Sequence, residues 1–234
     1  MKIKRLILSL SAATMVCAAE GQQPVTTLSV NGMREAVVDS GWPVIVTATI
    51  TGPEAKGRAE SIGLTAAVPD GASIELPFVS RRGATGTAAG AEIATAVWTL
   101  SPEAVSSLAP GNYRIEVSDG GAVASAVLLR VVSVLLPDQG TSISRFTLLS
   151  QWEEMQGHAD LALEWADKLV REQPQALAGH VRRADLLTAA GHYEDALAAL
   201  DEAETIYNRL EASSSHPPML IRYRKRKLLD EILR

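Results

Sequence analysis

The histidines of this 234-residue chain are the first side chains to test for chemistry, because imidazole serves both as a metal ligand and as a general base. His158 and His192 occupy equivalent places in two similar heptads, GHADLAL (157–163) and GHYEDAL (191–197). His180 and His216 have no Cys, Asp or Glu at ligand spacing. Because zinc needs three or four converging donors, we expect solvated or packing histidines, no metal site and no cofactor.

A glycine-rich stretch, GATGTAAGAE (83–92), is a second candidate, for phosphate binding. It lacks the Gly-Lys-Ser/Thr ending and the strand–helix context that a phosphate cradle requires, so we expect a flexible hairpin loop between strands. The sequence also contains no Gly-x-Ser-x-Gly and no His-Glu-x-x-His. We therefore expect a protein that is not an enzyme, and a hydrolase with a scattered active site remains an alternative.

The densest charge run is RYRKRK (222–227), which supplies Arg222, Arg224, Lys225, Arg226 and Lys227. One interpretation is a site for an anionic partner, such as a phospholipid headgroup, a polyanionic glycan or an acidic protein surface. The other is the solvated face of a helix, balanced by nearby Asp201, Glu202 and Glu204, and we favour it. A net charge of −5 and the expected export argue against nucleic acid as the main partner.

The N-terminal segment, 1–19, is expected to direct export. Lys2, Lys4 and Arg5 precede an apolar stretch at 6–16, and small residues follow at 17–19. This pattern is typical of a secretory signal peptide and is too short to span a bilayer, although an uncleaved anchor is the alternative. The run ending at Cys17 departs from the lipoprotein signal Leu-x-(Ala/Gly/Ser)-Cys, so we do not expect lipidation there. We expect a periplasmic or secreted protein with no cysteine and no transmembrane segment after cleavage.

Residues 24–135 show the period-two alternation of strands. The predicted strands are 25–30, 43–51, 61–68, 73–79, 91–100, 112–118 and 122–134, with Gly, Pro, Asn and Asp turns between them. The segment 108–113, LAPGNY, leads into a strand and resembles the tyrosine corner of immunoglobulin-like and fibronectin type III sandwiches. That resemblance implies that Tyr113 sends its hydroxyl back to nearby backbone. Trp98 is expected in the core.

After a linker at 136–142, the hydrophobic period changes to that of helices. The predicted helices are 143–156, 161–173, 176–190, 193–210 and 219–234. The repeated heptads recur at the period of the tetratricopeptide repeat, which this part of the chain resembles. Positions that match the family are Gly157, Ala162, Pro174, Ala184, Gly191, Ala196 and Ala203, whereas Ser150, Leu169, His180 and Asn208 depart from it.

The resemblance implies two repeats within 143–210, a capping helix at 217–234, and a concave face that holds a partner. The positions expected to line this face include Thr147, Gln151, Glu154, Met155, Val181, Asp185 and Thr188. The expected fold class is multidomain, all-β plus all-α: an Ig-like β-sandwich followed by a short TPR-like helical array with a capping helix.

The leading functional hypothesis is an exported, non-catalytic scaffold of the bacterial-type cell envelope whose helices hold a partner protein. The alternative is a glycan- or polymer-binding accessory module in an extracellular assembly. In that case Trp42, Phe78, Trp98 or Tyr113 would stack on sugars.

Overall fold

The chain follows two hydrophobic periods, and in a computed structural model each period builds its own compact unit. The structure describes residues 24–69, 72–81, 83–88, 91–119, 121–135, 138–210 and 218–233. Of these described residues, the strand-rich unit takes those within Met1–Val38, Val44–Leu100 and Leu108–Val132. The helical unit comprises Asp39–Pro43, Ser101–Ser107 and Ser133–Arg234. The expected signal peptide, Cys17 and His216 lie outside the described residues.

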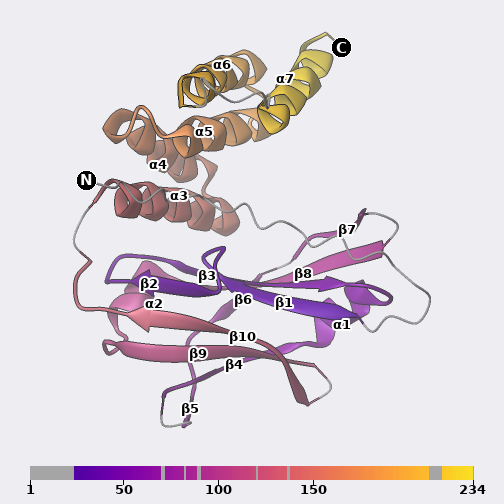
Figure 1. The fold of residues 1–234 in the computed structure, drawn as a ribbon, viewed down its shortest axis with the longest axis vertical. Helices are drawn as coiled ribbons and strands as arrows, with labels where there is room; N and C mark the ends of the chain where they lie inside the picture. Colours follow the sequence, from indigo (N-terminus) through magenta and orange to yellow (C-terminus); the bar gives the residue numbers. More distant parts are fainter. Residues whose placement is uncertain are drawn as a thin grey trace. The chain divides into compact units, whose positions relative to one another are not determined.

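Two sheets form two layers in the strand-rich unit (Figure 1). The first has the order β1 (Val25–Val30), β3 (Val44–Thr51), β8 (Ala91–Leu100), β6 (Val79–Arg81), and β7 (Thr85–Ala88) also pairs with β8. The second has the order β2 (Glu35–Val38), β10 (Ala122–Val131), β9 (Gly111–Asp119), β4 (Gly63–Ala67), β5 (Ser73–Ile74). All pairs are antiparallel except β2 with β10.

The alternating strands bury one set of small aliphatic side chains between the sheets, as the period of two requires. These residues include Val30, Val46, Ala48, Ile50, Ala94, Ile115, Val117 and Leu129. Tyr113 is buried, and its hydroxyl donates to the carbonyl of Ala109 at 2.6 Å. The hydrogen bond that the LAPGNY motif implied is therefore present.

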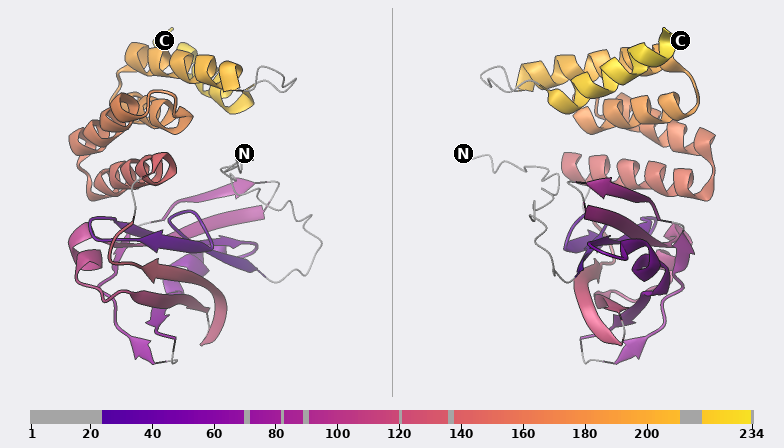
Figure 2. Two further views of the ribbon diagram at one scale, coloured as in Figure 1. Left: turned by 60° about the vertical axis from the view of Figure 1, so that its left-hand side comes forward. Right: turned by 90° about the vertical axis from the view of Figure 1, so that its right-hand side faces the viewer.

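Five helices follow the strands. They are α3 (Gln139–Gln156), α4 (Ala159–Glu172), α5 (Leu177–Ala189), α6 (Tyr193–Leu210) and α7 (Met219–Ile232). Figure 2 shows them stacked one after another. The helix α3 begins inside the segment expected as a linker, because the Asp138 carboxylate accepts from the amide of Thr141 and caps it.

The repeated heptads form the same helix ending twice. Gly157 and Gly191 adopt φ of 86° and 80°, a left-handed conformation that glycine reaches without strain. The amide of His158 donates to the carbonyl of Glu153, and that of His192 to the carbonyl of Leu187. Each heptad thus ends one helix and begins the next, which explains why the sequence repeats it.

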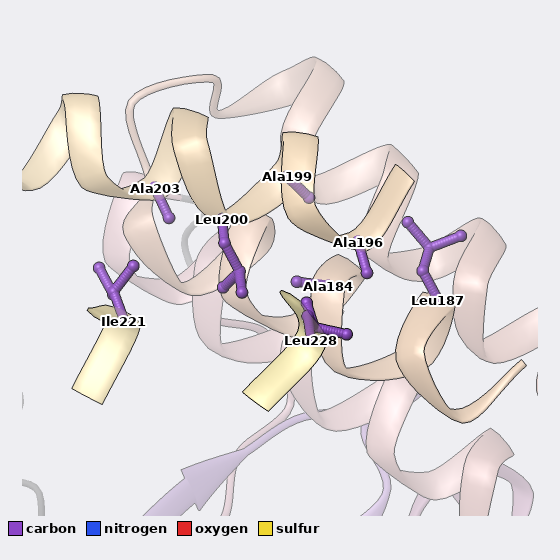
Figure 3. Packing of buried hydrophobic residues seen from close by; sticks show 8 residues of the cluster. All are labelled: Ala184, Leu187, Ala196, Ala199, Leu200, Ala203, Ile221 and Leu228. Atoms are coloured by element: carbon purple, nitrogen blue, oxygen red, sulfur yellow. The ribbon is translucent and has the colours of Figure 1, made fainter. Parts of the chain in front are cut away.

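The buried core of α5, α6 and α7 is built largely from alanine and leucine (Figure 3). Its buried members are Ala184, Leu187, Ala196, Ala199, Leu200, Ala203, Ile221 and Leu228. Small side chains allow close approach of the helices.

The fold class expected from the sequence is wrong. Helices account for 46% of the described residues and strands for 31%. The chain is therefore a mixed α/β protein in which strands come first and helices follow, and not an all-β domain joined to a tetratricopeptide array. The segment expected as a β-sandwich contains α1 (Ala55–Ser61) and α2 (Pro102–Ser106).

Both short helices depend on contacts that the hydrophobic pattern does not reveal. The amides of Ala55 and Lys56 at the start of α1 donate to the carboxylate of Glu92 on β8. The N-cap of α2 is Ser101, which accepts from the amide of Ala104. The glycine-rich stretch also differs from its prediction, because it contains the strand β7 rather than only a loop.

The helical part departs from a regular repeat array in its last step. Ala162 on α4 and Ala196 on α6 are both fully buried, and they are separated by the same interval as the two heptads. Arg183 on α5 pairs with Asp167 on α4, and Lys225 on α7 pairs with Asp201 on α6. The two contacts are equivalent, but the interval between Arg183 and Lys225 is longer than that between the heptads. The last helix therefore breaks the repeat period.

Candidate functional site

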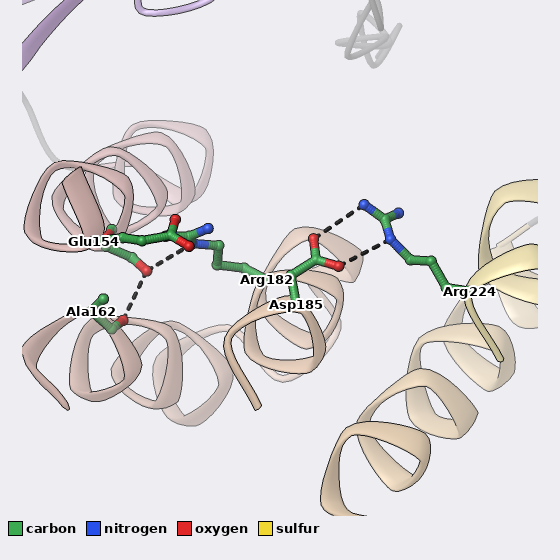
Figure 4. Close-up of polar contacts among 6 residues, drawn as sticks. Glu154, Ala162, Arg182, Asp185 and Arg224 are labelled. Carbon is green, nitrogen blue, oxygen red and sulfur yellow. Dashed lines mark hydrogen bonds and ion pairs between the residues drawn. The ribbon is translucent and has the colours of Figure 1, made fainter. Parts of the chain in front are cut away.

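A row of charged side chains runs across α3, α5 and α7 on the side where the sequence predicted a partner-binding face (Figure 4). Its members are Glu154, Arg182, Asp185 and Arg224, in that order, so the sign of the charge alternates. We call these four residues the charged row. Two of them, Glu154 and Asp185, were predicted as lining residues of the face.

Arg182 is the most enclosed member of the charged row, with 13% of its side chain exposed. It donates to the hydroxyl and the carbonyl of Ser150 at 2.9 and 3.1 Å, and to the carboxylate of Glu154 at 2.7 Å. The hydroxyl of Ser150 in turn donates to the carbonyl of Ala162 at 2.8 Å. Because these contacts join α3, α4 and α5, they fix the guanidinium in one orientation.

Asp185 and Arg224 form the other half of the charged row. The guanidinium Nε and Nη2 of Arg224 lie 3.0 and 3.1 Å from the two carboxylate oxygens, which is a bidentate pair joining α5 to α7. Partial burial raises the pKa of Asp185, and the positive charges of Arg224 and Arg182 oppose that shift. The ion pair therefore offsets part of the cost of removing this carboxylate from water.

The other predicted lining residues are less available. Thr147 and Thr188 donate their hydroxyls to carbonyls one turn earlier on their own helices. Val181 packs against the core of α5, α6 and α7, and Gln151 is half-buried. Met155, by contrast, keeps 38% of its surface exposed at the end of α3.

Arg182 and Ser150 are members of this site that the sequence prediction missed. Arg182 and Asp185 have the i, i+3 spacing that places both on one face of α5, and this was the signal available. The hydrogen bond from Ser150 to the next helix is set by tertiary packing, so no local pattern indicates it.

The basic run on α7 divides into two groups. Arg222 pairs with Glu204, Arg224 with Asp185, and Lys225 with both Asp201 and Glu204. These three cations hold α7 against the helices before it.

Arg226 and Lys227 form the second group. Both are exposed, and neither has an ion-pair partner among the described residues. The run is therefore partly a structural contact and partly a free positive surface.

The histidines are dispersed in the structure. Nδ1 of His158 lies 2.8 Å from a carboxylate oxygen of Glu153. His180 is buried, with Nε2 3.0 Å from the carbonyl of Pro174, and His192 is exposed. Across the described residues, no group of three or more His, Cys, Asp or Glu side chains is placed to hold a metal ion.

The aromatic residues considered for sugar stacking are mostly enclosed. Trp42, Trp98 and Tyr113 are buried, with 4%, 8% and 6% of their surface exposed. Phe78 is half-buried and, with Trp98, lines a hollow between β4, β5, β6 and β8. Trp42, Trp98 and Tyr113 therefore present no exposed ring face on which a sugar could stack.

Within the part of the chain that the structure describes, none of the helices combines the length and apolar character needed to cross a bilayer.

No protein-family model and no curated protein matches this chain. Among solved structures, it is similar to the amylomaltase of Corynebacterium glutamicum with a TM-score of 0.33 and 13% identity, over 47% of this chain and 14% of that chain. At so low a TM-score, this similarity carries no argument about fold or activity.

Proposed function

We propose that this protein is an exported, non-catalytic interaction protein whose helical unit binds an extended segment of a partner protein along the charged row. The single observation that carries the proposal is the alternation of half-exposed charges across three helices. Glu154 and Asp185 keep 47% and 41% of their side chains exposed, and Arg224 keeps 30%.

The carboxylates of the row have unused acceptor capacity. An ionised carboxylate can accept about four hydrogen bonds. Among the described residues, Glu154 accepts one hydrogen bond, from Arg182, and Asp185 pairs with Nε and Nη2 of Arg224. The remaining lone pairs suit the backbone amides of an extended segment, which a strand-like or polyproline-like conformation leaves free.

The ion pairs also hold these side chains in place before a partner arrives. Arg182 is fixed by three hydrogen bonds and Arg224 by a bidentate pair. Binding then requires little further ordering of long side chains, whose loss of rotamer freedom costs about 0.5–1.5 kcal/mol each. Met155 adds an apolar contact beside the row.

Photo-crosslinking tests the proposal. A photoreactive residue at Met155, which is exposed at the end of α3, should capture a partner protein from envelope extracts when it is placed in the full chain. The matched control is Ala198, which is exposed on α6, a helix that contributes no member of the charged row. Equal capture from Ala198 would contradict the proposal.

A binding measurement with a peptide from the captured partner completes the test. The double change Glu154→Gln with Asp185→Asn should weaken binding at least about ten-fold, equivalent to about 1.4 kcal/mol. Unchanged affinity would show that the charged row is not the binding surface.

We do not extend the proposal to glycans, because Trp42, Trp98 and Tyr113 are buried.

A further inference from the structure

The helix α7 packs on α6 in the way that α5 packs on α4. Arg183 of α5 lies 2.8 Å from the carboxylate of Asp167 on α4. Lys225 of α7 lies 2.6 Å from the carboxylate of Asp201 on α6. The carboxylates, at 167 and 201, keep the interval of the repeated heptads, whereas the cations, at 183 and 225, are further apart. Position 183 of α5 therefore corresponds to position 225 of α7. We call this correspondence, continued residue by residue along both helices, the α5–α7 register.

The apolar contacts follow the same register. Leu186 of α5 is buried against Ala162 and Ala166 of α4. In the α5–α7 register, Leu186 corresponds to Leu228. Leu228 is buried in a cluster with Ala196 and Leu200 of α6. These two residues follow Ala162 and Ala166 at the interval of the repeated heptads. Figure 3 shows Leu228 beneath this part of α6.

At a third place in the register, the small residue lies on one helix of the first contact and on the other helix of the second contact. A Cβ atom on Gly179 of α5 would lie 3.0 Å from the side chain of Leu169 on α4. At the equivalent place Ile221 of α7 lies beside Ala203 of α6 (Figure 3). The volume is conserved across the contact, so the α5–α7 register holds at three independent places along the helix.

The α5–α7 register also shows which face of α7 corresponds to the face of α5 that α6 covers. The side of α5 that α6 covers carries three apolar residues, Leu177, Val181 and Leu187. Their counterparts in the register are Met219, Tyr223 and Leu229, which are 69%, 65% and 44% exposed. We call these three residues the α7 stripe. It repeats the surface that receives a helix in α5, and no described residue covers it.

One position departs from the match and indicates the chemistry of the occupant. Ala184 of α5 is 1% exposed where α6 approaches, whereas its counterpart on α7 is the exposed Arg226. Arg226 has no ion-pair partner among the described residues. A helix on the α7 stripe must therefore place a carboxylate opposite this guanidinium, or bury an unpaired charge.

From this equivalence we propose that the α7 stripe binds an amphipathic helix of a partner protein whose apolar face carries one Asp or Glu opposite Arg226. A second copy of this chain is a poorer fit. A two-fold contact between two α7 helices would bring their cationic Arg226 side chains to the same interface. In this chain the α6 residues that share a buried cluster with Ala184 are all apolar, namely Ala196, Ala199, Leu200 and Ala203, so α6 of another copy would bring no carboxylate from that cluster to Arg226.

The test uses synthetic peptides based on α6, the helix that occupies the equivalent face of α5. The probe is the peptide of residues 193–210 with Ala199→Glu, and its matched control carries Ala199→Lys. Fluorescence anisotropy with the full chain should show tighter binding of the Glu peptide, by at least about ten-fold. Absence of binding by both peptides would overturn the proposal.

Charge reversal on the protein makes the test specific. The variant Arg226→Glu should prefer the Lys peptide, and Tyr223→Ser should weaken binding of the Glu peptide at least about ten-fold. A preference that does not reverse would overturn the assignment of Arg226. Sedimentation experiments test the other occupant. If the chain self-associates and Tyr223→Glu abolishes that self-association, the α7 stripe binds a second copy instead. Because Glu154 belongs to the charged row and pairs with Arg182 of α5 rather than with α7, Glu154→Gln should leave peptide binding unchanged, which separates this site from the charged row.

Discussion

Lys225 on α7 places its ammonium 2.6 Å from a carboxylate oxygen of Asp201 on α6. The same ammonium lies 2.6 Å from Glu204, and 23% of its side chain is exposed. The hydrogen bonds to Asp201 and Glu204 raise the pKa of Lys225 despite its partial burial. Since Ile221 and Leu228 are the buried apolar residues of α7, this ionic contact is a substantial part of the attachment of the helix.

Replacing this cation should loosen α7. We expect Lys225→Met to lower the free energy of unfolding of the helical unit by about 1 kcal/mol, because both carboxylates lose a donor. The control is Lys227→Met, which removes an exposed cation from the same helix and should change stability by less than about 0.5 kcal/mol. Urea unfolding followed by circular dichroism measures both, and equal effects would contradict the role assigned to Lys225.

The stability of the α6–α7 contact should depend on acid pH through Glu204. The hydrogen bond from Lys225, assisted by Arg222, lowers the pKa of this carboxyl below its ordinary 4.5 in spite of some burial. A carboxyl with a lowered pKa in the folded state stabilises the fold above its ordinary pKa and loses that contribution as pH falls through the folded value.

The difference in unfolding free energy between the natural chain and Glu204→Gln should therefore be largest near neutral pH and shrink below about pH 4.5. The control is Glu202→Gln, at an exposed position of the same helix. A difference that stays constant down to about pH 3 would show that the ionised form of Glu204 contributes nothing.

Tight helix packing gives a third prediction, at Ala196. This residue is fully buried in the core of α5, α6 and α7. A tryptophan there must displace neighbouring helices, and overpacking costs about 1–3 kcal/mol or more. Ala196→Trp should therefore lower the melting temperature of the helical unit markedly, whereas Ala198→Trp, on the exposed side of α6, should leave it nearly unchanged.

The sequence predicted elements well where one hydrophobic period runs without interruption. The strand at 91–100 and the helix at 193–210 begin and end at the predicted residues. The helix α1 was missed because its first amides are capped by Glu92, which is far away in the sequence. Local patterns cannot indicate such a cap.

The candidate site was predictable in its residue types and unpredictable in its pairing. Lys225 and Lys227 are near neighbours in the sequence and chemically identical, yet among the described residues Lys225 pairs with carboxylates and Lys227 does not, because the packing of α7 on α6 decides which side is enclosed. The α7 stripe was missed for a related reason. The tetratricopeptide resemblance implies a single period, and the last helix follows α5 at a longer interval than that period.

A fourth prediction concerns the buried tyrosine of the strand-rich unit. Tyr113→Phe removes the donor to the carbonyl of Ala109 while keeping the ring, and should lower the unfolding free energy by about 1 kcal/mol. Tyr223→Phe makes the same chemical change on a side chain that is 65% exposed and should have little effect. Equal stability of both variants in urea would show that the Tyr113 hydrogen bond does not contribute.

The last prediction uses the close approach of the backbone at Gly83 to strand β8. A Cβ atom on Gly83 would overlap the carbonyl oxygen of Thr95, so any larger residue must push the segments apart. The hydrogen bond from the amide of Ala84 to the hydroxyl of Thr95, at 2.8 Å, depends on the same approach. We expect Gly83→Ala to destabilise the strand-rich unit by about 2 kcal/mol or more. Gly86→Ala is the matched control on the adjoining strand β7, because a Cβ there meets no atom within 4 Å. Thermal unfolding of the two variants should differ clearly, and a Gly83→Ala protein as stable as Gly86→Ala would show that the backbone segments do not approach each other this closely.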